Sequence, residues 1–374
     1  MNNYFFCNNS LQTLVSAKIA QNHFSNFNNI LIISNDIKNY EYIYSSMKKT
    51  GVFADVICFN VKECICKKKN FHFKVKRAFC ELVGCSKVKS FIKHFQFDDC
   101  ANIFLNGPRC YIEYLVRVIK KKNKNVKINL FEEGYSSYTK QYEMTLFNFS
   151  LFENLFRKIS SFYRGNHINK YVSSLYLFEP ELLLWNCKYE VVKIKNVDND
   201  NTFLNTMSIF FTNYNHVFND TKCKFIFLEE SFWLDYNENG DLKMLEKISK
   251  DFPLSDFYVR LHPRSYINRF EMLNVNMYPD SPIPWELLLL KYHKDTILVT
   301  VSSGSAISSR HFFNMNNPII FLKKCCVNNH MEEESINIWF EKWIKIHNDN
   351  VFCPENYEEF LDIIKMLERG KNYE

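Results

Sequence analysis

Short apolar runs alternate along the chain with longer segments whose apolar positions recur at helical spacing. The short runs predict strands of a buried parallel sheet, which is apolar on both faces. The longer segments predict helices with one apolar face. The expected strands cover residues 4–7, 30–34, 52–59, 102–105, 126–131, 171–178, 224–228, 257–261, 296–301 and 318–322. The expected helices cover residues 11–21, 37–49, 74–95, 109–122, 150–163, 241–250, 284–292, 305–313, 332–346 and 357–368.

This alternation of strands and helices predicts an α/β protein with parallel, doubly wound sheets. With 374 residues, the chain is longer than a single hydrophobic core usually grows. A polar stretch at 196–201, rich in Asn and Asp, marks a boundary between two such units. We therefore expect two Rossmann-like domains that face a central cleft, residues 1–215 and residues 216–374. The last helix is a candidate to pack back on the first domain.

Charge and cysteine content narrow the class of partner. The formal net charge is +6, with lysine clusters at 67–69 and 120–122. Such clusters usually form a solvated face. The aromatic residues do not alternate with the basic ones at the spacing of a nucleic-acid-binding protein, so no nucleic-acid partner is expected. An anionic membrane attracts each nearby basic side chain by about 1 kcal/mol, which favours peripheral membrane contact. The 13 Cys lack paired zinc spacing, so we expect reduced thiols and no metal site.

No signal peptide begins the chain, and no uncharged stretch reaches the length of a membrane span. These features predict a cytoplasmic protein.

Candidate chemistry gathers in three polar islands, each directly after an expected strand. They are Glu132-Glu133-Gly134, His262-Pro263-Arg264 and Ser302-Ser303-Gly304-Ser305. In open α/β sheets, ligands bind outside the carboxyl ends of the strands. The islands therefore predict an acid/base site beside an anion site.

In the first island, Gly134 permits a sharp turn with positive φ. A carboxylate there can deprotonate a sugar hydroxyl if burial and its charged neighbour raise its pKa. The alternative interpretation is a solvated acidic turn.

The other islands carry the features of a phosphate site. Pro263 keeps His262 extended at the mouth of its strand, and Arg264 suits bidentate phosphate contacts. The serine cluster precedes a helix, whose first N–H groups bind anions. Glu286 lies in the first turn of a helix that begins at Pro284 and can accept from ribose hydroxyls. A surface histidine, a plain helix cap and a buried Trp285 are the alternatives.

The order of an acidic pair with Gly, then His-Pro, then Pro-aromatic-Glu and a serine cluster resembles the bacterial sialyltransferases. The pattern is similar to glycosyltransferase family 52 and to the related bacterial polysialyltransferases. The opening Phe6-Cys7-Asn8-Asn9-Ser10-Leu11-Gln12 also resembles the start of family 52 chains. The resemblance implies a GT-B fold with an N-terminal acceptor-binding domain and a C-terminal nucleotide-sugar-binding domain.

The resemblance also implies an inverting transfer from CMP-sialic acid without a metal or other cofactor. The resemblance implies that Glu132 is the base that deprotonates the acceptor hydroxyl, with Glu133 as the second candidate for this role. His262 is also catalytic, because it contacts the CMP phosphate and aids its departure. The expected donor-binding residues are His262, Pro263, Arg264, Ser302, Ser303, Gly304 and Ser305 at the phosphate and Glu286 at the ribose, and Gly134, Asn9 and Gln12 lie on the acceptor side. The expected acceptor is a hydroxyl, most simply of galactose, on a lipid-linked surface glycan such as lipooligosaccharide or capsule. The expected location is the cytoplasm, and peripheral contact with the cytoplasmic face of the inner membrane is left open.

Three alternatives stay open from the sequence. The donor could be a UDP-hexose or another CMP-nonulosonic acid, or the chain could be a non-catalytic binding protein on the same fold. Homodimer formation is also open.

Overall fold

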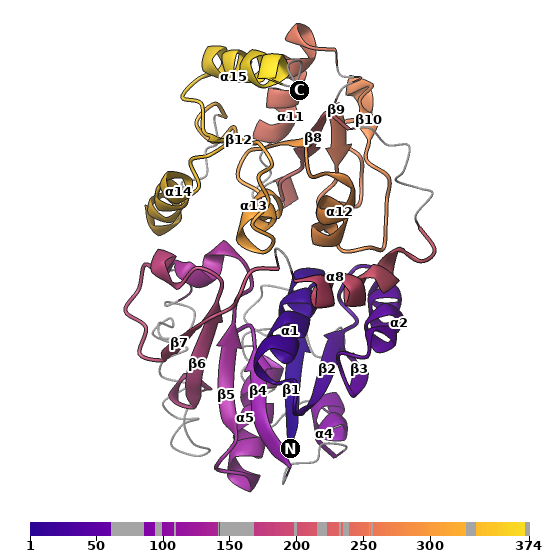
Figure 1. Cartoon of the computed structure of the whole chain (residues 1–374), viewed down its shortest axis with the longest axis vertical. Coiled ribbons are helices and arrows are strands. Elements are labelled where there is room, and N and C mark those ends of the chain that lie inside the picture. The colour runs from indigo at the N-terminus through magenta and orange to yellow at the C-terminus, as the bar shows by residue number, and fades with distance from the viewer. Residues whose placement is uncertain are drawn as a thin grey trace. The chain divides into compact units, whose positions relative to one another are not determined.

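The structure is a computed structural model of the whole chain, shown in Figure 1. It describes residues 1–60, 86–93, 99–107, 110–140, 142, 168–197, 200–214, 223–231, 233–234, 239–253, 255, 257–326 and 334–370. The expected helix at 150–163, most of that at 74–95 and the lysine cluster at 67–69 lie outside these residues. The chain divides into two compact units, Met1–Phe210 and Phe211–Glu374. The sequence analysis placed this boundary after residue 215.

The first unit is built on a seven-stranded parallel sheet with the order β3-β2-β1-β4-β5-β6-β7. Its strands are β1 (Asn2–Cys7), β2 (Asn28–Ser34), β3 (Asp55–Phe59), β4 (Cys100–Leu105), β5 (Lys127–Phe131), β6 (Val172–Leu177) and β7 (Glu190–Lys193). The strand order reverses between β1 and β4. Because crossover connections are right-handed, helices that follow β1 and β4 cover opposite faces of the sheet.

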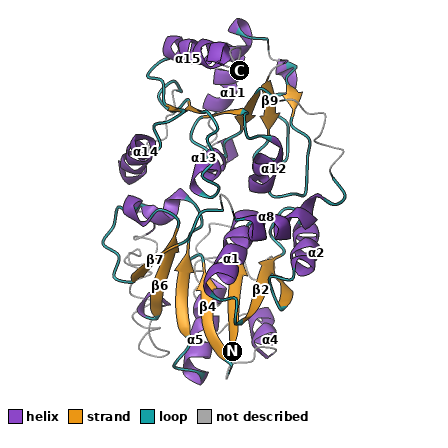
Figure 2. Ribbon diagram, viewed as in Figure 1, coloured by secondary structure: helices purple, strands orange, loops and turns teal. Residues whose placement is uncertain are grey.

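The helices of this unit are α1 (Ser10–His23), α2 (Tyr40–Thr50), α4 (Ser86–Lys93), α5 (Cys110–Lys122) and α8 (Asn201–Met207). Short 3-10 helices are η1 (Tyr135–Tyr138), η2 (Ile168–Lys170), η3 (Pro180–Leu182) and η4 (Ser208–Phe211). Helix α1 packs against β1 and β2, and α4 contacts α5. Figure 2 shows the strands side by side with these helices around them.

A row of buried asparagines crosses four adjacent strands of this sheet. The amide of Asn129 donates to Asn102 at 3.2 Å, and Asn102 donates to Asn3 at 2.9 Å. Asn3 donates to Asn29 at 2.9 Å, and Asn29 donates to the Phe24 carbonyl at 2.9 Å. Buried amides are costly unless they are hydrogen-bonded. The row therefore fixes the strand register, since a one-residue slip would leave these groups unpaired.

The second unit is built on a six-stranded parallel sheet with the order β10-β9-β8-β11-β12-β13. Its strands are β8 (Phe225–Leu228), β9 (Phe257–Arg260), β10 (Asn276–Met277), β11 (Ile297–Thr300), β12 (Ile319–Phe321) and β13 (Val351–Phe352). Its helices are α11 (Gly240–Asp251), α12 (Trp285–Tyr292), α13 (Gly304–His311), α14 (Glu334–Ile346), α15 (Tyr357–Gly370) and the 3-10 helix η6 (Glu271–Leu273). The order reverses between β8 and β11, which is the place where open α/β sheets bind ligands.

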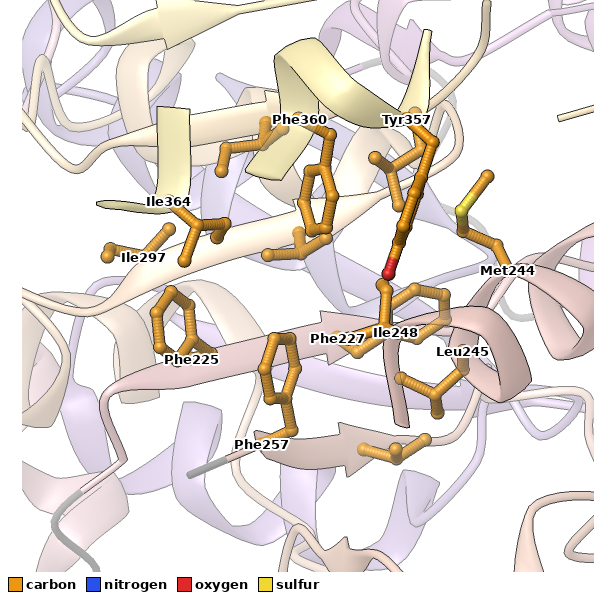
Figure 3. Close-up of a cluster of buried hydrophobic side chains, with 14 of the residues drawn as sticks. Phe225, Phe227, Met244, Leu245, Ile248, Phe257, Ile297, Tyr357, Phe360 and Ile364 are labelled. Atoms are coloured by element: carbon orange, nitrogen blue, oxygen red, sulfur yellow. The ribbon is translucent and has the colours of Figure 1, made fainter. Parts of the chain in front are cut away.

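Figure 3 shows the apolar core that holds α11 and α15 on one face of the second sheet. Phe225 and Phe257 stack with ring centroids 4.7 Å apart. Tyr357, Phe360 and Ile364 of α15 belong to this core. The apolar face of α15 is thus used within its own unit, and the suggestion that the last helix packs back on the first domain stays a prediction. The expected pair of parallel α/β domains is confirmed.

Candidate functional site

The acidic island lies where β5 ends in the first unit. Glu132 is 5% exposed, and its Oε2 atom accepts from the Tyr138 hydroxyl and from the Phe178 amide at 3.0 Å. Burial and the nearby charge of Glu132 hold the pKa of Tyr138 well above its usual value. The Tyr138 hydroxyl therefore stays protonated and donates a hydrogen bond to the Glu132 carboxylate. Two donors orient Glu132, as a positioned base requires.

Glu133 has a more open environment than Glu132. Its side chain is partly exposed, and its Oε1 atom is 3.5 Å from the Ser136 hydroxyl. Its amide donates to the Ser137 hydroxyl at 3.0 Å. Gly134 follows with a φ of +130°, so the positive φ expected from the sequence is confirmed. This turn leads into η1, which carries Tyr138 back to Glu132.

Asn9 and Gln12 lie at the start of α1, beyond the carboxyl end of β1. The Asn9 side chain caps α1 by accepting from the Gln12 amide at 2.8 Å. Gln12 is buried, and its Oε1 atom accepts from the Asn8 amide at 2.6 Å. Both side chains therefore shape the β1–α1 turn. In the sheet, β4 lies between β1 and β5, so these residues and the acidic pair stand at separate strand ends. Their role in acceptor binding stays a prediction.

In the second unit, the His262 loop follows β9. His262 is partly exposed, and Pro263 and Arg264 are exposed. The Arg264 amide donates to Nδ1 of His262 at 3.1 Å. Because Nδ1 accepts here, a neutral His262 imidazole carries its proton on Nε2.

The serine cluster forms the turn between β11 and α13. Ser303 is the N-cap of α13, and its hydroxyl accepts from the Ser305 amide at 3.3 Å. Ser302 and Ser303 are buried, whereas Gly304 is exposed. The predicted strand–turn–helix arrangement is therefore confirmed, with the first N–H groups of α13 at the carboxyl end of β11.

A second acidic pair, Glu229-Glu230, joins these two loops and was missed in the sequence analysis. It follows β8, the strand between β9 and β11. Glu229 accepts from the His262 amide at 2.7 Å, and Glu230 accepts from the Ser302 amide at 2.6 Å. The signal was available, because an apolar run ending in Glu-Glu is the same pattern as the Glu132-Glu133 island. The hydrogen bonds show that the His262 loop and the serine turn lie together.

Glu286 lies beside the same two loops, in the first turn of α12 as predicted. Its Oε2 atom is buried without a hydrogen-bond partner among the described residues, and burial raises its pKa, although the charge of Arg260 opposes this. The preceding Trp285 donates from its indole to the Ser305 carbonyl at 3.0 Å. The Arg260 guanidinium lies 4.5 Å from the centre of the Trp285 ring. Trp285 is thus buried, as the more conservative interpretation held, yet it connects Arg260 to α13.

The hydrogen bonds of Glu229, Glu230 and Trp285 thus connect the His262 loop, the serine turn and the start of α12 within the second unit. The role of the predicted donor-binding residues stays a prediction. Arg260 also lies near the carboxylates of Glu286 and Asp280. Across the part of the chain that the structure describes, no group of His, Cys, Asp and Glu side chains has the arrangement of a metal site. Among the same residues, no helix is long and apolar enough to cross a membrane.

Comparison with known proteins gives a family and a fold. The family model described as alpha-2,8-polysialyltransferase (POLYST) matches residues 3–320. This match confirms the resemblance to bacterial sialyltransferases. No curated protein matches the chain.

Solved structures of similar fold include nucleotide-sugar enzymes. UDP-GlcNAc 2-epimerase of Methanocaldococcus jannaschii, solved with UDP-GlcNAc and UDP, has a TM-score of 0.57 at 13% identity. The match covers 98% of this chain and 92% of the epimerase chain. TcCGT1 in complex with UDP has a TM-score of 0.50 at 10% identity, covering 98% and 90%. At such identity the likeness shows the fold alone, and it confirms the predicted two-domain GT-B fold.

Proposed function

Because the chain belongs to the alpha-2,8-polysialyltransferase family, we propose that it is an inverting sialyltransferase that transfers sialic acid from CMP-sialic acid to a glycan hydroxyl. The observation that carries the proposal is the cluster around the end of β8. There, adjacent carboxylates hold the His262 loop and the serine turn together, with Glu286 and Arg260 beside them. A nucleoside monophosphate such as CMP presents an anionic phosphate and ribose hydroxyls. This cluster offers hydrogen-bond donors for the phosphate and an acceptor for a ribose hydroxyl.

The donor half of the reaction uses the second unit. The Nε2–H of His262, the guanidinium of Arg264 and the first N–H groups of α13 contact the phosphate of CMP. The unpartnered Oε2 atom of Glu286 accepts from a ribose hydroxyl. As the bond between the anomeric carbon and the phosphate oxygen breaks, negative charge grows on the phosphate. Donors already in position for that charge lower the barrier, and His262 supplies a proton to the departing CMP.

The acceptor half uses the first unit. Glu132 takes the proton of the acceptor hydroxyl, and the acceptor oxygen attacks the anomeric carbon from the side opposite to CMP. Configuration at that carbon is inverted, and no covalent enzyme intermediate forms. Gly134 leaves room beside the carboxylate, since within 4 Å nothing occupies the position of a side chain there. A metal is not required, because charge on CMP is balanced by protein donors.

The acceptor within this proposal is a galactose or sialic acid hydroxyl of a lipid-linked surface glycan. The reaction would take place at the cytoplasmic face of the inner membrane, where such acceptors and activated sugars meet. Exposed Lys121 and Lys122 at the end of α5 would add a weak attraction to anionic lipids.

The test is release of CMP from CMP-sialic acid, measured with lactose, sialyllactose and lipooligosaccharide acceptors. We expect release that depends on the acceptor, together with binding of CMP in calorimetry. Binding that prefers UDP over CMP would replace this proposal with a UDP-hexose transferase. Absence of both turnover and nucleotide binding by the folded protein would favour a non-catalytic role on the same fold.

A further inference from the structure

The carboxylates of Glu229 and Glu230 are buried next to each other at the end of β8. The Glu229 side chain has no exposed area, and Glu230 as a residue is 7% exposed. Burying two adjacent negative charges is unfavourable unless each is matched by donors or a cation. The donors that match them therefore indicate what the pair does.

Glu229 is directed toward the loop that follows β9. Its Oε2 atom accepts from the His262 amide at 2.7 Å and from the Ser265 hydroxyl at 2.5 Å. Its Oε1 atom accepts from Arg269 at 2.9 Å and 3.1 Å. Arg269 also pairs with Asp241 of α11 at 2.7 Å. Both oxygens of Glu229 are thus occupied, and the charge of Arg269 compensates its burial.

Glu230 is directed toward the loop on the other side, after β11. Its Oε1 atom accepts from the Ser302 amide at 2.6 Å and from the Thr300 hydroxyl at 3.0 Å. The same Thr300 hydroxyl accepts from the Ser303 amide at 3.2 Å. Glu230 therefore fixes the two residues that lead into the N-terminus of α13.

We propose that Glu229 and Glu230 are positioning residues, which hold the His262 loop and the serine turn at the separation that a single donor phosphate requires. This inference rests on the proposed function, because it assumes that both loops contact the donor. Glu229 accepts from the loop after β9, and Glu230 accepts from the turn after β11. One dipeptide at the central strand can therefore set both loops at once, and neither carboxylate has to touch the donor itself.

The pair predicts different tolerance to substitution at the two positions. In Glu229→Gln, one acceptor becomes an NH2 group that faces either Arg269 or the His262 amide, so the loop loses its support. In Glu230→Gln, the amide oxygen can still accept from Ser302. We expect Glu229→Gln to lower kcat/KM by roughly 10–100-fold, by analogy with the loss of residues that orient metal ligands. Glu230→Gln should retain clearly more activity than Glu230→Ala.

A double-mutant cycle with His262→Ala separates positioning from a general loss of folding. Glu229 acts through the His262 loop, so Glu229→Gln should cost little further activity once His262 is absent. Glu230→Ala acts through the serine turn, so its fold-loss should be retained in the His262→Ala background. Ser265→Ala is a milder test of the Glu229 contact than Glu229→Gln, because it removes one donor to Glu229 without a change of charge. It should lower kcat/KM in the wild-type background only.

The assay is CMP-sialic acid turnover with CMP binding by calorimetry and urea unfolding of each variant. If the wild-type protein binds CMP and turns over, but Glu229→Gln loses as much activity in the His262→Ala background as in the wild-type background, the positioning role is overturned. Loss of activity in proportion to unfolding alone also overturns it. If the wild-type protein neither binds CMP nor turns over, the proposed function itself fails, which is a distinguishable result.

Discussion

At the scale of single residues, the two carboxylates of the first island have different surroundings. Glu132 is held by Tyr138 and the Phe178 amide, whereas Glu133 is partly exposed and contacts Ser136. A base has to be oriented and has to keep its orientation when the acceptor arrives. These contacts favour Glu132 for proton transfer, with Tyr138 as the residue that orients it.

Substitution of both carboxylates and of Tyr138 tests this assignment. Glu132→Gln should lower kcat by roughly 10²–10⁴-fold, the span of general acid–base catalysis, with little change in CMP affinity. Tyr138→Phe keeps the ring but removes one hydrogen bond, so kcat should fall by up to about tenfold. Steady-state kinetics and CMP calorimetry provide both readouts.

Glu133→Gln is the matched control, because it makes the same chemical change one residue away. It should stay within a few-fold of the wild-type kcat. If Glu133→Gln is the crippled variant and Glu132→Gln is active, the assignment of the base is wrong.

At the scale of elements, the asparagine row ties β5, β4, β1 and β2 together. Asn102 occupies the middle of it, donating to Asn3 and accepting from Asn129. Asn is abundant along this chain, as are the 36 Phe residues, so its number alone says little. These particular amides, however, connect neighbouring strands of the sheet.

Asn102→Ala should destabilise the first unit by about 2–4 kcal/mol, because it leaves a buried acceptor on Asn3 and a buried donor on Asn129 unsatisfied. Urea unfolding followed by circular dichroism measures this change. Asn125→Ala is the control, since Asn125 is exposed and should change stability by no more than about 0.5 kcal/mol. Equal effects of the two substitutions would show that the row does not stabilise the sheet.

At the scale of the whole molecule, stability should depend on pH through a buried histidine. His293 is 1% exposed and lies between the Tyr278 hydroxyl, 2.7 Å from Nε2, and the Thr296 hydroxyl, 3.3 Å from Nδ1. Burial lowers the pKa of His293 from 6.5 to about 4. Between these values the unfolded chain binds a proton that the folded chain does not, so the stability contribution is full above pH 6.5 and is lost as the pH falls toward 4.

Between pH 7 and pH 5 this loss should amount to about 2 kcal/mol. It is measured as the difference in unfolding free energy between the wild-type protein and His293→Gln, which cannot take up the proton. Other titrating groups cancel in that difference. The advantage of the wild-type protein should shrink as the pH falls, and a constant difference over this range would contradict the assignment.

The sequence by itself determined most of the elements and the place of the chemistry. Apolar runs followed by helical periodicity located strands β1 to β6, β8, β9, β11 and β12, because burial in a parallel sheet leaves a local signature. The three islands followed from the same reasoning, since a polar residue directly after a buried strand has to lie at its carboxyl end. Elements β7, α8, β10 and β13 were missed because they are short or polar, and their formation depends on neighbours distant in the chain.

Only the tertiary structure decided how these parts meet. Strand order places β8 between β9 and β11, and this order makes Glu229 and Glu230 the common support of two loops that are remote in sequence. It likewise aligned Asn3, Asn29, Asn102 and Asn129 into one row, and placed α15 on the second sheet. Such pairings bring together residues with large separations along the chain, and no local periodicity records them. The sequence determines which side chains stand at strand ends, whereas the order of the strands decides which of them can act together.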